Sequence, residues 1–162
     1  MASPDALVRL PSVAEYVAAF AALDAQSAIT EKQHAMLLHH HKQPGRTVSA
    51  TTLAHAVGYS GYESANSQYG RLGAMVASEI GLTLRSVQVG VLVDFVYPDQ
   101  AANDQFLWMM REHVAVALEE LGWVPKVSQY LYPHAAIEVG VTRGSSTPPR
   151  ADASGQTSVQ LA

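Results

Sequence analysis

Apolar side chains recur every three or four residues in five stretches of the chain, and this spacing predicts five amphipathic helices. The expected helices cover residues 13–23, 31–43, 50–57, 63–80 and 105–121. Most of them follow side chains that cap helix N-termini, namely Ser12, Thr30, Ser49 or Thr51, and Asn103 or Asp104. Gln33 stands three residues after Thr30, which is the spacing of a capping box.

The expected helix over residues 63–80 contains two glycines, Gly70 and Gly73. Each glycine costs about 1 kcal/mol of helix propensity relative to alanine. Such residues indicate either that another stretch of backbone packs closely against the helix or that the helix breaks there.

One stretch is typical of a strand rather than of a helix. Residues 87–96 are rich in β-branched side chains, and Tyr97-Pro98-Asp99 follows as a stop. Residues 82–85 and 47–48 are candidate partner strands. The sequence therefore predicts a mainly α fold with a small antiparallel β element, and the order of elements resembles a winged helix-turn-helix.

Length and composition are those of one globular domain with a tail. The chain has 162 residues, of which 48% are hydrophobic and none is cysteine, so disulfides and thiolate metal sites are excluded. We expect residues 1–29 to form an N-terminal helix that packs on the core, and residues 30–125 to form that core. Residues 126–142 are expected to dock as a short apolar segment, and residues 143–162, rich in Gly, Ser, Thr and Pro, to be a disordered tail.

The N-terminal residues lack the basic start and long apolar region of a signal peptide. The longest uninterrupted apolar run, residues 16–23, is far too short to span a bilayer. We therefore expect a cytoplasmic protein with no membrane partner.

The stretch from residue 47 to residue 73 predicts a short helix, a glycine-bearing turn and a longer helix, which is the layout of a helix-turn-helix. In that motif the first helix braces the second, and side chains near the start of the second enter the major groove. Asparagine and glutamine suit adenine, while arginine suits guanine or phosphate. The candidate DNA contacts are Arg46, Tyr59, Tyr62, Ser64, Asn66, Ser67, Gln68 and Arg71.

Charge is unevenly distributed along the chain, although the net charge is −4. Residues 31–85 carry five basic and three acidic side chains, whereas residues 86–125 carry one basic and six acidic ones. The basic middle permits a patch that faces phosphate. The acidic, apolar second half, with Trp108-Met109-Met110, favours the alternative of a protein-interaction module, including a homodimer. A third interpretation is a helical hairpin whose polar face is only solvated.

Several of these positions resemble a bacterial domain found free-standing and at the N-terminus of some HNH-type endonucleases. The matching residues are Thr30, Met36-Leu37, Pro44-Gly45-Arg46-Thr47-Val48, Leu53-Ala54, Val57-Gly58-Tyr59, Ala65-Asn66, Gln68-Tyr69-Gly70-Arg71-Leu72-Gly73, Val91–Val96, Asn103 and Leu118–Trp123. The resemblance implies a DNA-associated accessory domain. The chain has no counterpart of the HNH metal region, so nuclease activity is not implied.

The candidate chemical groups do not form a catalytic set. His39-His40-His41 point about 100° apart on a helix, so they cannot together bind one metal ion, and we expect a solvated or phosphate-near helix end. Asp94, with His113 or His134 as a partner, is the best remaining acid–base candidate, and nothing in the sequence links these residues. We expect a protein that is not an enzyme and has no cofactor.

Overall fold

The computed structural model describes residues 7, 9–84, 87–97 and 106–127. The chain divides into two units between residues 126 and 127, and the first unit is the one described below. Nearly all of the second lies outside the described residues. The predicted docking segment, from residue 128 on, and the predicted disordered tail fall there.

The described residues are mainly helical, and the helices form where their capping signals stand. The α-helices are α1 (Val13–Ala25), α2 (Glu31–Lys42), α3 (Ala50–Ala56), α4 (Tyr62–Ile80) and α5 (Glu112–Glu120). Thr30 and Gln33 make both hydrogen bonds of a capping box at the start of α2. Ser49, and not Thr51, caps α3, because its hydroxyl accepts the backbone N–H of Thr52. The helices predicted in the first half of the chain are confirmed.

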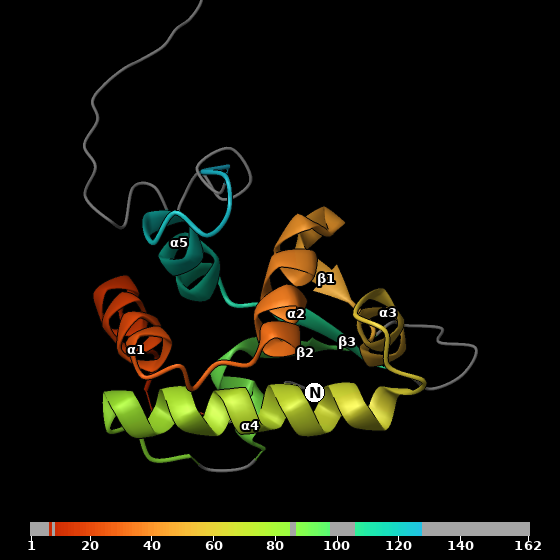
Figure 1. The fold of residues 1–162 in the computed structure, drawn as a ribbon, viewed down its shortest axis with the longest axis horizontal. Helices are drawn as coiled ribbons and strands as arrows, with labels where there is room; N and C mark the ends of the chain where they lie inside the picture. The colour runs from red at the N-terminus through yellow and green to blue at the C-terminus, as the bar shows by residue number, and fades with distance from the viewer. Residues whose placement is uncertain (1–6, 8, 85–86, 98–105, 128–162) are drawn as a thin grey trace, which may run out of the picture. The chain divides into compact units, whose positions relative to one another are not determined.

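A small antiparallel sheet packs among these helices (Figure 1). Its strands are β1 (Thr47–Val48), β2 (Val93–Val96) and β3 (Leu107–Met110), in the order β1-β3-β2. β3 is the central strand: Trp108 lies opposite Val48 on one side and Phe95 on the other. The predicted strand at residues 47–48 is confirmed, but its partner is β3.

The strand predicted over residues 87–96 is wrong in its first half. Gln88–Val91 form the short 3-10 helix η2, and only Val93–Val96 form a strand. The cause is helix packing: the Gln88 carbonyl group lies where a side chain on Gly73 of α4 would be. The predicted partner strand at residues 82–85 is not in the sheet. Leu84 instead makes an isolated bridge to Leu7, and residue 85 lies outside the described part.

The helix predicted over residues 105–121 is also too long. Leu107–Met110 are the strand β3, and α5 begins only at Glu112, after Arg111 as its N-cap. As a strand, this segment pairs with the backbones of both β1 and β2 and buries Trp108 and Met110 on alternate positions. The predicted caps at residues 103 and 104 lie outside the described residues.

The core lies where α1, α4, α5 and the sheet meet. α1 packs against both α4 and α5. The buried Tyr16 donates a hydrogen bond of 2.7 Å to the carbonyl oxygen of Val91, and Trp108 stacks on Tyr69 with ring centres 5.5 Å apart. Within the part of the chain that the structure describes, no helix has the length and apolar character needed to cross a membrane.

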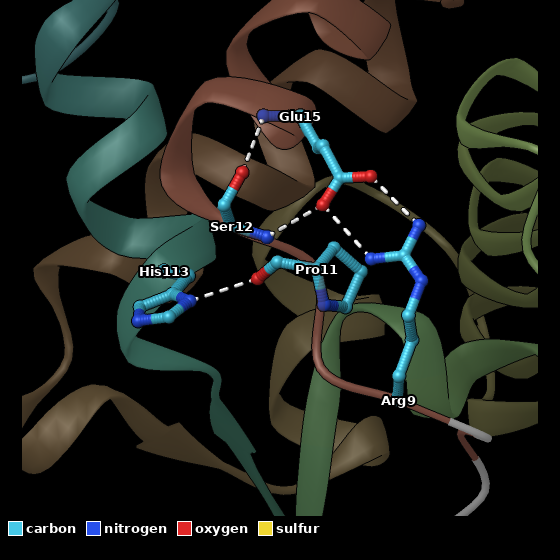
Figure 2. Close-up of polar contacts among 5 residues, drawn as sticks. All are labelled: Arg9, Pro11, Ser12, Glu15 and His113. Atoms are coloured by element: carbon cyan, nitrogen blue, oxygen red, sulfur yellow. Dashed lines mark hydrogen bonds and ion pairs between the residues drawn. The ribbon is translucent and has the colours of Figure 1, made fainter.

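Polar contacts fix the start of α1 to its surroundings (Figure 2). The Ser12 hydroxyl accepts the backbone N–H of Glu15, whose carboxylate accepts the Ser12 N–H and two bonds of 2.9 and 2.7 Å from Arg9. The bonds from Arg9 and from the Ser12 backbone lower the pKa of Glu15 to about 2. His113 of α5 hydrogen-bonds through Nδ1 to the Pro11 carbonyl at 2.8 Å. This link joins α5 to the segment that leads into α1.

Candidate nucleic-acid interface

The helix pair α3 and α4 is joined by a tight turn at residues 57–61. α3 buries Leu53 and Ala54. The chain then turns through Gly58, whose φ of +87° favours glycine, and the Tyr59 N–H donates back to the Ala54 carbonyl at 2.9 Å. Gly61 is the N-cap of α4. The short first helix therefore packs against the N-terminal half of the long second helix, which runs along one side of the unit (Figure 1).

α4 has one buried and one exposed face. Ala65, Tyr69, Leu72 and Val76 are buried, which fixes the rotation of the helix. Ser67 and Arg71 are exposed on the opposite side, and Asn66 is exposed at the edge of the buried face. The helical repeat places Tyr62, Asn66 and Gly70 on one ridge, and Glu63, Ser67 and Arg71 on the next.

The tyrosines and the remaining polar positions near this face differ in exposure. Tyr62 is 47% exposed, whereas Tyr59, Ser64 and Gln68 are partly buried. The buried Gln33 amide donates to Gln68, at 3.2 Å to the backbone oxygen and 3.4 Å to the side-chain oxygen. Gln68 is thus held toward α2. The Lys32 ammonium group lies 4.4 Å from the centre of the Tyr59 ring, a cation–π distance.

Arg46 does not join the predicted set of surface contacts. It closes the 3-10 turn η1 (Pro44–Arg46) with a φ of +54°, and it is only 3% exposed. The side chain is buried between the exposed Gly45 and the partly buried Thr47 that begins β1. The expectation that Arg46 lies on the surface beside the α4 residues is therefore corrected.

The histidine run is likewise not a solvated helix end. His40 is fully buried, with Nδ1 3.0 Å from the Tyr69 hydroxyl and Nε2 3.0 Å from the Trp108 carbonyl oxygen. The carbonyl can only accept, so the neutral ring carries its proton on Nε2 and the Tyr69 hydroxyl donates to Nδ1. Burial lowers the pKa of His40 to about 4 and raises that of Tyr69. His40 is therefore uncharged at neutral pH.

The next histidine has a different partner. His41 Nε2 lies 2.9 Å from a carboxylate oxygen of Glu119, and both side chains are buried. Burial lowers the pKa of His41 in spite of the hydrogen bond that the ring donates to Glu119, and the positive charge of Arg46 acts in the same direction. At neutral pH the contact is a hydrogen bond between a neutral ring and a carboxylate, and it ties α2 to α5.

The acid–base candidates are held in separate structural contacts. Asp94 lies 3.0 Å from a guanidinium nitrogen of Arg111, whose Nε donates to the Gly90 carbonyl at 2.9 Å. His113 bonds to the Pro11 carbonyl, and His134 lies outside the described residues. Over the described ranges, no three His, Asp or Glu side chains are grouped as metal ligands would be.

A hollow beside the exposed face of α4 was not foreseen from the sequence. Its lining comes from α4, from η2 with the residue before it, and from both strands of the β2–β3 pair: Asn66, Gly70, Val87, Gln88, Val89, Phe95, Phe106 and Trp108. Phe106, predicted to face inward on a helix, is 42% exposed and directly precedes β3. In the sequence, the only indication of this hollow is Gly70, because helix propensity gives no reason for a glycine at that position of α4.

Comparisons with models of known protein families, with curated proteins and with solved structures gave no match. The functional interpretation therefore depends on the geometry and chemistry of the residues described above.

Proposed function

We propose that this chain is a winged helix-turn-helix protein that binds double-stranded DNA without catalysing a reaction on it, with α4 as the helix that enters the major groove. The order of elements supports the proposal. β1 lies between α2 and α3 and pairs with β3, and the β2–β3 pair follows α4. In helix-turn-helix proteins, the second helix of the motif presents its N-terminal residues to base edges.

One observation carries the proposal: the first turns of α4 expose Asn66, Ser67 and Arg71, with Ser67 and Arg71 opposite the buried face and Asn66 at its edge. An asparagine amide can make two hydrogen bonds to adenine, and an arginine can make two to guanine or bind a phosphate. The hydroxyl group of the exposed Tyr62 suits a phosphate oxygen at the helix start. Bracing by α3 holds these side chains on a rigid element.

The charges predict how strongly the binding depends on salt. The chain has a net charge of −4, and the described part of the structure places two exposed cations near the site, Arg71 on α4 and Lys32 on α2. Each phosphate contact contributes about −0.9 to the slope of log affinity against log salt. We therefore expect a shallow salt dependence, in keeping with a few phosphate contacts rather than a broad basic surface.

Fluorescence polarisation with a labelled duplex library tests the proposal. Polarisation should rise with protein concentration, and affinity should fall between about 50 and about 200 mM salt. The tightest sequences recovered from the library then supply a specific site. A lack of binding up to about 100 µM protein, the weak limit of non-specific association, would overturn the proposal. A stable homodimer by light scattering together with that result would point to a protein-interaction module instead.

Three variants of α4 locate the interface. Arg71→Ala should reduce the salt slope by about 1, and Asn66→Ala should cost about 1–3 kcal/mol on the specific site and leave other duplexes unaffected. Ser78→Ala is the matched control, because Ser78 is exposed near the C-terminal end of the same helix. Equal affinities of all three variants and the unmodified chain would contradict an interface on the first turns of α4.

A further inference from the structure

The hollow beside α4 is an open depression with the volume of a small-molecule site. Its volume is about 530 Å³, within the range of roughly 300–1,000 Å³ that ligand pockets occupy. Its walls come from three segments that are distant in sequence: Asn66 and Gly70 on α4, residues 87–89, and the aromatic residues of the β2–β3 pair. A site assembled in this way is fixed by the fold rather than by one mobile loop.

Gly70 gives an independent reason to regard the hollow as a binding site. A Cβ atom on Gly70 would meet only the side-chain oxygen of Gln88, at an ordinary contact distance of 3.8 Å. Packing therefore does not require glycine here, in contrast to Gly73, where a Cβ atom would collide with the Gln88 carbonyl group. Gly70 nevertheless costs the helix about 1 kcal/mol relative to alanine. What the missing side chain provides is open space in the wall of the hollow.

The lining side chains specify the chemistry of an occupant. Three of the described lining residues are aromatic: the buried Trp108, and Phe95 and Phe106, which meet edge to face with ring centres 5.2 Å apart. Asn66 and Gln88, both exposed, add carboxamide groups, each with a donor and an acceptor. Among the residues that the structure describes, none of the lining side chains is charged. An occupant that suits these walls is planar, uncharged and apolar on its faces, with donors and acceptors on its edge.

We propose that this hollow binds a nucleobase. Nucleobases combine a stacking face with an amide-like edge, and proteins bind unstacked bases by aromatic stacking together with hydrogen bonds to that edge. The base has two possible sources, a free nucleoside or an unstacked base of a nucleic-acid strand. The inference does not depend on duplex binding by α4, although Asn66 borders both surfaces.

Amide NMR spectra of the ¹⁵N-labelled full chain test this site. The probes are adenosine, cytidine, thymidine and short single strands of oligo(dA) and oligo(dT), each titrated to millimolar concentration. We expect saturable shifts of the Gly70, Gln88 and Val89 backbone amides and of the Asn66 side-chain amide. If a nucleoside binds, the free compound is sufficient to occupy the site. If only the single strands bind, the occupant is a base within a strand. No saturable shift with any probe, or shifts confined to other surfaces, would overturn the proposal.

Variants that fill or open the hollow complete the test. Gly70→Leu should abolish the shifts, and Phe106→Ala should weaken binding about tenfold through loss of one stacking wall. Ser78→Leu places the same side chain on an exposed position of α4 outside the hollow, so binding should be unchanged. Phe106 is already 42% exposed, so its truncation remains informative if Gly70→Leu fails to fold. Undiminished binding by the folded variants would exclude the hollow as the site.

Discussion

Neighbouring identical residues have different surroundings in this molecule, and His40 and His41 are the clearest case. His40 bonds through both ring nitrogens to Tyr69 and Trp108, while His41 bonds to Glu119. The run of histidines in the sequence does not distinguish them, because their partners lie far away in the chain. The exposure of Asn66, Ser67 and Arg71, in contrast, followed from helical spacing alone.

The burial of His40 predicts a loss of stability in mild acid. Its pKa is about 4 in the folded chain and near the ordinary 6.5 in the unfolded chain, so between these pH values only the unfolded state binds the proton. Acidification from pH 6.5 to pH 4 should therefore reduce the free energy of unfolding by about 2–3 kcal/mol, and the lowered pKa of His41 acts in the same direction. From this contribution no change is expected above pH 7.

Urea unfolding at a series of pH values measures this effect, and the His40 ring signals report the cause. A titration midpoint of His40 close to 6.5 would contradict the assignment.

At the scale of elements, the helices are specified by residues next to them in the sequence, and the sheet is specified by pairing between distant segments. The caps of α1, α2 and α3 lie within four residues of the groups that they cap, so the local sequence predicts them. The local sequence of β3 predicts the start of a helix, because Leu107–Met110 are all apolar. It becomes a strand because β1, about sixty residues earlier, and β2 both pair with it. The prediction that Arg46 lies on the surface is wrong for a related reason. The spacing of apolar residues along the chain does not reveal a positive φ such as the one at Arg46.

The two glycines of α4 should respond oppositely to the same substitution. Gly73→Ala forces η2 away from the helix, because its Cβ would collide with backbone, and should destabilise the fold by about 1–3 kcal/mol. Gly70→Ala meets no such obstacle and should be neutral or stabilising by up to about 1 kcal/mol. Chemical denaturation followed by circular dichroism measures both. Similar losses for the two variants would show that the contact between η2 and α4 is not specific to Gly73.

Across the whole molecule, the two candidate sites share one helix. The exposed ridges of α4 carry the proposed duplex contacts, and the hollow adjoins the ridge of Asn66 and Gly70. The first site could be predicted because one helix supplies most of it. The second could not, because its walls meet only after residues 66–70, residues 87–89 and the aromatic residues Phe95, Phe106 and Trp108 have come together in the tertiary structure.

The His40 ring touches three elements at once, α2 that carries it, α4 through Tyr69 and β3 through Trp108. These elements should consequently open together when the native state fluctuates, and their backbone amides should exchange with deuterium as one protected group. Tyr69→Phe removes the hydroxyl that His40 Nδ1 needs, at about 1–2 kcal/mol, and should speed exchange about 5- to 30-fold in α2, α4 and β3 alike. Tyr62→Phe, on the exposed ridge, should leave the rates unchanged. Faster exchange in α4 alone would mean that the three elements open independently.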